Sequence, residues 1–542
     1  MQVSLEAIKF NHDLESATAD ALNIRRNETE AVVVPEWRRG VSVLPDDSPA
    51  AYARDAIGEN QITIKAKFKC CDPKIRSVEV RAIDPARNLE ARCDSEGNAI
   101  GEVGEREITF DTNGESDFES FDLINVDIYN RGVSSSISTL IWQYRLRHSD
   151  TWSNLTTTCH RIYTLLDVPK CAWRQQPFDG RNIQLPWTEV LDYACQWASG
   201  AQGIDEAAGR ITQAVFDLGK SLVVYDGPST YADLTFDCTS LLNLIHDDKG
   251  LGQTLNCEDC ATTVSTFANA VGCDLWQSCI GTAVFTTNPI RLIGASDFRR
   301  FDFDYHEVAW KNDCSFNDDL FDSCLQVDAD DDPSHPPESG VLPIQTKFGT
   351  LQKGNYRFQL ALPPLAGQVD TCQPTPEKRQ RRALGLNSAR QVDCTMAASS
   401  GTGLQSDDPA VSTPPIFSGN VTIGPWELYR VRFLKRDDIL FGAFSLWFLP
   451  DGDPEHLMRL DYYQHGTPEA ATREKERLLK RYQVRDSRQD SDLSHSAFDF
   501  ILVTDRAFMG QAGAVVVEVR SVGRKNIDPR QFTEIFSEIM NQ

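Results

Sequence analysis

The segment LNCEDCATTVSTFANAVG, residues 255–272, predicts a helix and decides the fold of the middle of the chain. Its apolar residues recur every three or four positions, which places them on one face of a helix. Gly272 is positioned to end that helix. The residues of the apolar face are Ala261, Val264, Phe267 or Ala268, and Val271.

The same segment predicts how the helix begins. Asn256 is a favoured N-cap, and Asp259 three residues later completes an approximate capping box. Cys257 is then the first helical residue, exposed at the helix tip, where free N–H groups and the helix dipole favour a thiolate. Because Glu258 and Asp259 oppose that thiolate, we expect a histidine as its cationic partner.

His306 and Asp322 follow on two successive strand-like runs, at a spacing that can bring them into contact. His306 lies in the strand-like run FDFDYHEVAW, and a second run, LFDSCLQVD, follows the polar stretch KNDCSFND. If the two runs form a hairpin centred near Cys314, His306 falls opposite Asp322. Directly opposed residues of antiparallel strands have Cβ atoms about 4.5–5.5 Å apart, so the carboxylate can orient the imidazole.

A cysteine at a helix start, then a histidine and an aspartate on successive strands, resembles the transglutaminase-like superfamily of papain-type thiol enzymes. Members carry C-x-D-[FY]-A around the nucleophile, and residues 257–261 read CEDCA. The HEVAW run and the LFD run loosely resemble the strands that carry the histidine and the aspartate in that family. The resemblance covers roughly residues 170–335.

The resemblance implies the role of each residue. Cys257 is the nucleophile, His306 the general base and Asp322 its orienting partner, while Cys260 stands where the family has a packing aromatic. The oxyanion-hole side chain has no clear match, and Gln253 and Tyr231 are the candidates.

The expected reaction is attack on an amide or peptide carbonyl of a protein or peptide substrate through a thioester, without a cofactor. Hydrolysis is favoured over transfer to an amine because water is the simpler acceptor. The alternative is a catalytically degenerate binding or scaffold protein in a larger assembly.

Other chemistries fit the cysteines and acids less well. A redox CxxC pair at residues 257–260 would sit early in a βαβ unit, whereas here helices precede it. A zinc site from Cys257, Cys260, Cys273 and Cys279 has poor spacing. Asp328, Asp330, Asp331 and Asp332 could bind calcium, but they lack the glycine and terminal glutamate of a calcium loop.

The rest of the chain predicts a multidomain α+β protein. In residues 1–168 apolar and polar residues alternate, which predicts the strands of a β-sandwich, with an immunoglobulin-like fold as one option. The expected strands are 61–68, 77–83, 107–110, 138–146 and 156–166. Residues 169–335 form the transglutaminase-like domain, with further helices at 186–199, 204–218 and 237–245 and strands at 274–280, 283–293, 301–310 and 320–327. Residues 336–414 are an extension and linker, partly disordered. Residues 415–542 form an α+β domain, with strands at 426–434, 441–449, 498–504 and 514–522 and helices at 468–482 and 529–540.

Composition narrows the partners and the location. With 542 residues and a net charge of -25, the chain is a poor candidate for binding nucleic acid or an anionic membrane. The N-terminus lacks a signal-peptide pattern and no apolar run could span a bilayer, so we expect a cytoplasmic protein whose 15 cysteines are reduced. Export without a signal peptide stays open. The basic run KRQRR, residues 378–382, is either a solvated patch or a protease-sensitive or docking segment.

Overall fold

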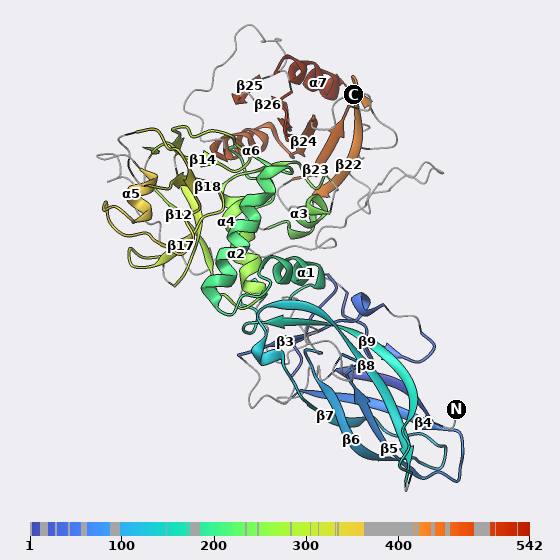
Figure 1. The fold of residues 1–542 in the computed structure, drawn as a ribbon. Helices are drawn as coiled ribbons and strands as arrows, with labels where there is room; N and C mark the ends of the chain where they lie inside the picture. The colour runs from blue at the N-terminus through green and yellow to red at the C-terminus, as the bar shows by residue number, and fades with distance from the viewer. Residues whose placement is uncertain are drawn as a thin grey trace. The chain divides into compact units, whose positions relative to one another are not determined.

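The protein, seen in a computed structural model, is a mixed α+β chain with several sheets (Figure 1). It divides into two compact units, each described by itself: Met1–Ala214, Thr263–Trp276 and Ala309–Asp313 form the first, and Val215–Thr262, Gln277–Val308 and Cys314–Gln542 the second. The residues described are 3–10, 20–27, 30–41, 44–55, 62–86, 98–147, 149–170, 172–173, 185–232, 236–246, 249–281, 284–303, 305–312, 314–330, 332, 335–361, 417, 422–434, 439–449, 456–481, 499–504, 506–527 and 529–541. Of the predicted extension and linker, residues 362–414, which include the KRQRR run, lie outside them.

The first unit contains a nine-stranded sheet whose strand order is β2-β1-β4-β7-β6-β5-β8-β9-β3. The strands are β1 (Val3–Phe10), β2 (Trp37–Arg38), β3 (Ala50–Ala53), β4 (Thr63–Cys70), β5 (Ser77–Ile83), β6 (Glu102–Thr109), β7 (Glu119–Ile124), β8 (Ser134–Leu146) and β9 (Ser153–Leu165). Neighbouring strands are antiparallel along most of the sheet, while the edge strand β3 pairs parallel with β9.

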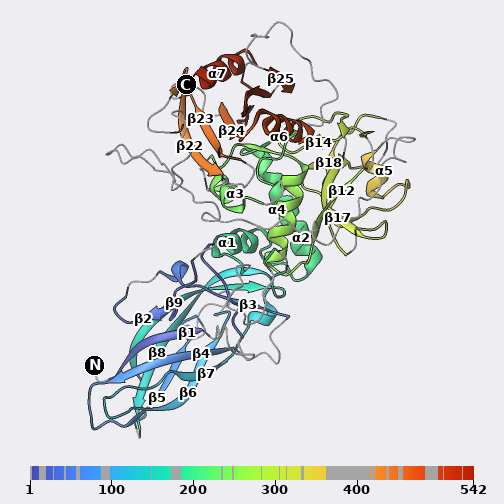
Figure 2. The same cartoon turned by 180° about the vertical axis from the view of Figure 1, so that it is seen from behind.

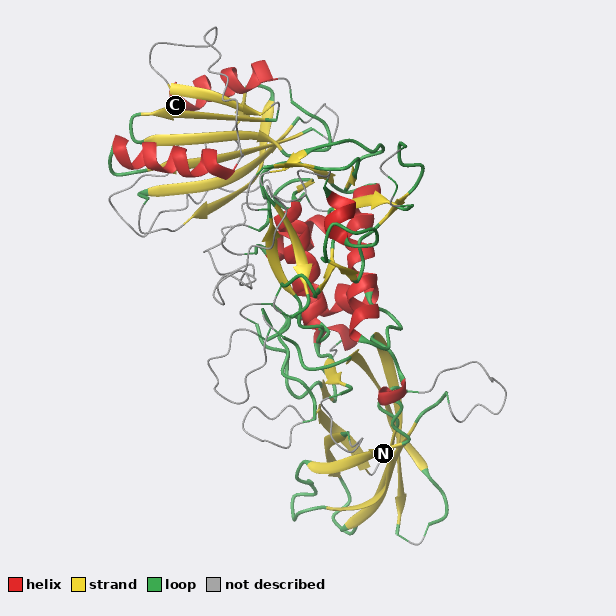
Figure 3. Cartoon of the chain, turned by 90° about the vertical axis from the view of Figure 1, so that its left-hand side faces the viewer, coloured by secondary structure: helices red, strands yellow, loops and turns green. Residues whose placement is uncertain are grey.

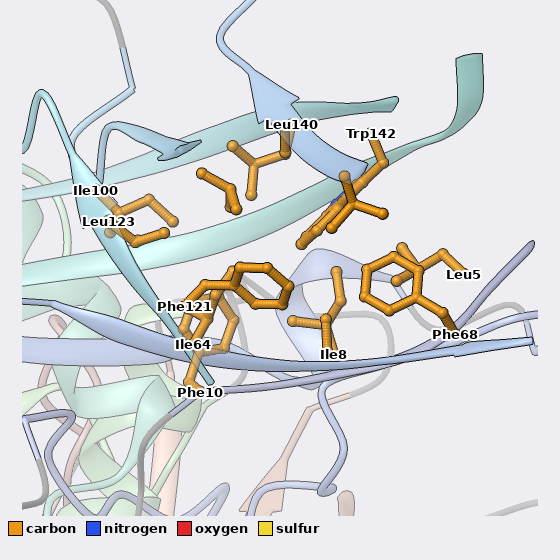
Figure 4. Close-up of a cluster of buried hydrophobic side chains, with 14 of the residues drawn as sticks. Leu5, Ile8, Phe10, Ile64, Phe68, Ile100, Phe121, Leu123, Leu140 and Trp142 are labelled. Carbon is orange, nitrogen blue, oxygen red and sulfur yellow. The ribbon is translucent and has the colours of Figure 1, made fainter. Parts of the chain in front are cut away.

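The sheet folds over so that its two halves share one core. In β4 and β5 every second residue is buried, as the period-2 pattern predicts. Figure 4 shows side chains from β1, β4 and β7 meeting those of β8. Trp142 makes edge-to-face contacts with Phe68 and Phe121 at centroid distances of 5.8 Å and 6.1 Å.

The middle of the chain contains the helices α1 to α5 and several short strands (Figure 2). In chain order they are α1 (Thr188–Trp197), α2 (Ile204–Asp217), β10 (Val224–Tyr225), α3 (Cys238–Ile245), β11 (Thr254–Leu255), α4 (Cys257–Ala270), β12 (Trp276–Ile280), β13 (Phe285–Thr286), β14 (Arg291–Leu292), β15 (Asp302–Phe303), β16 (His306–Trp310), β17 (Asp319–Phe321), β18 (Leu325–Asp328), β19 (Gly340–Val341), β20 (Thr346–Lys347) and α5 (Tyr356–Leu360). One sheet has the order β12-β16-β17-β20, so the strand that begins with His306 is the neighbour of the strand that precedes Asp322.

The C-terminal part of the second unit is a seven-stranded sheet, the C-terminal sheet, with the order β21-β22-β23-β24-β27-β26-β25 (Figure 3). Its elements are β21 (Thr422–Ile423), β22 (Trp426–Leu434), β23 (Phe441–Phe448), β24 (Leu457–Gln464), α6 (Pro468–Arg481), β25 (Asp499–Thr504), β26 (Ala507–Ala512), β27 (Val515–Ser521) and α7 (Pro529–Asn541). Alternate residues face opposite sides, so Phe508 packs with Phe536 of α7 and Met509 packs with Leu478 of α6. Each face is therefore covered by one helix.

Candidate functional site

The capping box at the start of α4 has the form expected from the sequence. The backbone N–H of Asn256 donates to Asp259 Oδ2 at 3.1 Å, and the N–H of Asp259 donates to Asn256 Oδ1 at 3.0 Å. These reciprocal bonds satisfy N–H groups that would otherwise be unpaired at a helix start. Cys257 is the first residue of α4.

Asp259 also organises a loop that comes earlier in the sequence. Its carboxylate is completely buried and accepts hydrogen bonds from four groups of that loop, namely Ser229 Oγ (2.7 Å) and the backbone N–H groups of Thr230 (2.8 Å), Tyr231 (2.7 Å) and Ala232 (2.7 Å). Burial raises the pKa of Asp259, and these donors act against the increase. The aspartate of the C-x-D pattern is therefore a structural anchor that ties residues 229–232 to the start of α4.

Cys257 is not exposed at the helix tip, which corrects one expectation from the sequence. Its side chain is buried, at 4% relative exposure. Burial raises the pKa of the thiol well above its usual value, and the negative charges of Glu258 and Glu307 raise it further. A hydrogen bond from the Glu307 backbone N–H lowers it in part. Burial and the neighbouring acids therefore favour the thiol over the thiolate.

His306 and Asp322 are in direct contact. His306 Nε2 lies 2.9 Å from Asp322 Oδ2, and both side chains are buried. The other oxygen, Oδ1, accepts the Cys324 backbone N–H at 2.8 Å. The His306 ring also stacks on Phe303, with centroids 5.4 Å apart and an interplanar angle of 9°. The imidazole is held by a carboxylate at one edge and by an aromatic ring on one face.

The second ring nitrogen of His306, Nδ1, has different surroundings from Nε2. Nδ1 is buried and has no hydrogen-bond partner among the described residues. The backbone of the next residue, Glu307, is close enough to Cys257 to lower the pKa of its thiol. The sequence-predicted Cys257, His306 and Asp322 are all buried in the second unit, and together they are called the candidate cluster.

A tyrosine outside the expected domain completes the surroundings of Asp322. Tyr356, in α5, donates its hydroxyl to Asp322 Oδ2 at 2.6 Å and is fully buried. Burial raises the pKa of Tyr356 well above its usual value, with the negative charge of Asp322 as the next cause. Tyr356 lies in the stretch predicted to be an extension and linker, and no local sequence signal there indicates the contact.

The two oxyanion-hole candidates from the sequence have different surroundings. The Tyr231 hydroxyl donates to the Gly252 carbonyl at 2.6 Å and accepts the Leu251 N–H at 3.1 Å, so it is engaged in holding this loop. Gln253 donates its backbone N–H to the Val522 carbonyl at 2.5 Å. Its side-chain Oε1 is buried without a partner in the described part of the chain.

Sequence reasoning missed two tyrosines near the sulfur. Tyr225 in β10 pairs with Leu255 of β11, two residues before Cys257, and its ring centroid is 6.4 Å from that of Phe303. Burial raises the pKa of Tyr225 well above its usual value. Tyr305, directly before His306, donates its hydroxyl to Glu258 Oε1 at 2.5 Å. That hydrogen bond joins the neighbours of Cys257 and His306 along the chain.

The alternative metal sites find no support in the geometry. Among the described residues, no three His, Cys, Asp or Glu side chains are grouped so that they could hold a metal ion. No disulfide joins the described cysteines, among them Cys257, Cys260, Cys273 and Cys279. In the acidic loop, His335 Nε2 lies 3.2 Å from Asp330 Oδ2, and Asp331 is outside the described residues.

A cavity of about 660 Å³ lies in the first unit and is not formed by the cluster. Its lining is charged with both signs and includes Arg54, Asp55, Asp205, Asp274 and Lys311. Lys311 Nζ is already paired with Asp205 Oδ1 at 2.6 Å. Cys257, His306 and Asp322 do not line this cavity, so its size adds nothing to the case for chemistry at the cluster.

Among the described residues, no helix is long and apolar enough to cross a membrane.

Comparison with known proteins adds no further constraint on the function. No protein-family model matches the chain, and no curated protein matches it.

Proposed function

We propose that the second unit carries a transglutaminase-like cysteine hydrolase or acyltransferase site, with a transglutaminase-like fold between an N-terminal β-sandwich and a C-terminal α+β domain. The observation that carries the proposal is the buried His306–Asp322 contact, with Nδ1 of the same imidazole unpartnered among the described residues and the backbone of Glu307, the next residue, close to Cys257. A histidine oriented by a carboxylate, with its other nitrogen near a thiol, is the arrangement that nucleophilic thiol catalysis requires.

The first half-reaction forms a thioester. Nδ1 of His306 takes the proton of the Cys257 thiol as the sulfur bonds to the carbonyl carbon of an amide or peptide. The negative charge on the carbonyl oxygen is stabilised by the backbone N–H of Cys257, and we propose the Tyr225 hydroxyl as the second donor. The same Nδ1–H then protonates the leaving amine while the C–N bond breaks. Asp322 accepts the Nε2–H bond throughout and stabilises the imidazolium.

The second half-reaction releases the acyl group. His306 Nδ1 takes a proton from water, which attacks the thioester carbon, and the sulfur leaves as a thiolate that regains the proton. An amine in place of water would give acyl transfer. Because Cys257 is buried, a protein or peptide substrate reaches it only after the side chains around the sulfur move apart. We propose hydrolysis as the main outcome.

A small activated ester tests the site without knowledge of the natural substrate. On incubation with p-nitrophenyl acetate, we expect acetyl transfer to Cys257, detected by mass spectrometry of the peptide that contains it. His306→Ala should slow this step by a factor on the order of 10²–10⁴, and Cys257→Ala should abolish it. Cys260→Ser, in the same helix and also buried, is the matched control and should retain the rate.

The raised pKa of Cys257 favours a second candidate, a degenerate scaffold in a larger assembly. The same experiment separates the two. If the protein is a scaffold, Cys257 will be acetylated no faster than the other buried cysteines, and His306→Ala will leave the acetylation rate unchanged.

A further inference from the structure

Four charged side chains are buried on one face of the C-terminal sheet. They are Arg459 and Asp461 of β24 and Glu518 and Arg520 of β27, and none exceeds 4% relative exposure. The register sets Arg459 opposite Arg520 and Asp461 opposite Glu518, so that like charges face each other across the strands. Because directly opposed like charges destabilise a sheet and buried charges are costly to desolvate, stability alone does not account for this arrangement.

Arg459 is held firmly and reaches a distant segment. Its Nε pairs with Asp461 Oδ1 at 2.7 Å, and its guanidinium lies over the Phe444 ring, 4.4 Å from the centroid. Its Nη1 donates to the backbone carbonyl of Thr230 at 3.2 Å. A planar guanidinium fixed on two sides can place a carbonyl with little loss of side-chain entropy.

Thr230 is the residue through which this contact reaches the start of α4. Its carbonyl accepts from Arg459, while its N–H donates to Asp259 Oδ2. The same Oδ2 accepts the N–H of the N-cap residue Asn256, which directly precedes Cys257. A continuous series of hydrogen bonds therefore leads from the guanidinium to the residue before the proposed nucleophile.

Two further contacts of the C-terminal sheet hold the same part of the second unit. Arg506 Nε lies 3.6 Å from Asp226 Oδ2, just before the loop. The Val522 carbonyl accepts the Gln253 N–H at 2.5 Å, four residues before Cys257. The C-terminal sheet and the residues next to its strands thus contact Asp226 and Gln253, which lie on either side of residues 227–251. They also contact the Thr230 carbonyl.

We infer that Arg459 is a positioning residue for Cys257: the C-terminal sheet fixes the 229–232 loop, and through Asp259 that loop sets the start of α4. The consequence for acylation rests on the proposed function, whereas the ordering of the loop does not. The C-terminal sheet, which contributes none of Cys257, His306 and Asp322, then affects the rate at which the thiol is acylated.

The experiment compares Arg459→Gln with Arg459→Lys and Arg520→Gln in the full chain. Arg520→Gln is the matched control, because it removes an equally buried cation whose ion pair is with Glu518. Hydrogen exchange of the 230–232 amides reports on the loop, and p-nitrophenyl acetate acylation reports on Cys257. In Arg459→Gln we expect exchange of those amides to rise and acylation to fall, each on the order of tenfold. Arg459→Lys should recover part of both, and Arg520→Gln should change neither.

The two readouts keep this inference apart from the proposed function. If the amides of residues 230–232 stay protected in Arg459→Gln, or are exposed equally in Arg520→Gln, the positioning role is overturned. If the loop responds only to Arg459 but the acylation rate of a competent wild-type Cys257 does not, it is also overturned. If wild-type Cys257 is not acylated at all, the proposed function fails, and the exchange data still decide whether Arg459 orders the loop.

Discussion

At the scale of single residues, Asp322 is the point where three stabilising contacts converge. His306 and Tyr356 share its Oδ2, and the Cys324 N–H occupies Oδ1. Its own N–H donates to the Pro343 carbonyl at 2.9 Å. A carboxylate held on both oxygens can orient an imidazole without moving, so it should matter more for the rate than for stability.

Replacing Asp322 by Asn should lower the rate of Cys257 acylation at least about a hundredfold, because an amide cannot stabilise the imidazolium or hold its tautomer. Tyr356→Phe removes only one donor to the carboxylate, and a loss of about tenfold is expected. The rates are measured with p-nitrophenyl acetate. Equal rates for Asp322→Asn and the wild type would contradict the orienting role.

Asp259 should matter for stability. Asp259→Ala leaves several buried N–H groups without their acceptor, and we expect a loss of about 3 kcal/mol or more in local unfolding free energy. The check is the urea concentration at which peptides from residues 224–262 lose protection from hydrogen exchange. The control is Glu258→Gln, the neighbouring acid, for which the change should be below about 1 kcal/mol. A similar effect for both variants would count against the anchor.

Much of the candidate site could be predicted from local patterns, because its central residues lie near element boundaries. The N-cap and capping box of α4 depend on residues 256–259 alone. The His306–Asp322 contact depends on one short hairpin. Tyr225 and Tyr356 could not be placed, because their proximity to the cluster arises from contacts between distant segments that no periodicity records. The burial of Cys257 was missed for the same reason.

At the scale of elements, the regular strands and helices were the most predictable. Residues 77–83 and 426–434 are β5 and β22 with the expected bounds, and α4 starts where the N-cap predicts. β24 was missed because Arg459 and Asp461 interrupt its apolar pattern, although both are buried. The strand expected at 320–327 is two strands, β17 and β18, separated by the residues around Asp322.

The turn before β11 offers a sharp test of the contact with the C-terminal sheet. Gly252 has φ +134°, and a Cβ there would lie 2.5 Å from Val522 Cβ. Gly252→Ala should cost about 2 kcal/mol or more through strain and overlap. Gly227 has no atom within 4 Å of its would-be Cβ, so Gly227→Ala is the control and should cost less. Thermal unfolding of both variants gives the comparison, and equal midpoints would refute the close approach.

At the scale of the whole molecule, acid should weaken the first unit through His160. Burial lowers the pKa of His160 to about 4 from an ordinary value of 6.5. Its Nε2 lies 2.9 Å from Thr158 Oγ1, and its ring packs edge-to-face on Phe10. Between pH 6.5 and 4 the unfolded chain binds a proton that the folded chain does not, so stability is complete above pH 6.5 and falls as the pH is lowered.

The loss should reach about 3 kcal/mol near pH 4, from roughly 1.4 kcal/mol per pKa unit. His160→Gln cannot take up that proton, and its stability should fall less between pH 7 and pH 5. Hydrogen exchange of β8 and β9 peptides at the two pH values measures the difference. An unchanged pH dependence in the variant would assign the acid sensitivity to other groups.

The burial of Cys257 also bears on the durability of the protein under oxidative stress. Peroxides react with thiolates that they can reach, and Cys257 is a covered thiol with a raised pKa, whereas Cys71 and Cys159 are exposed. An aged preparation should lose its accessible sulfhydryls first, while the Cys257 sulfur stays reduced. The number of free thiols would therefore decline before the rate of Cys257 acylation does. The burial of Cys257 would protect its sulfur from oxidation during storage.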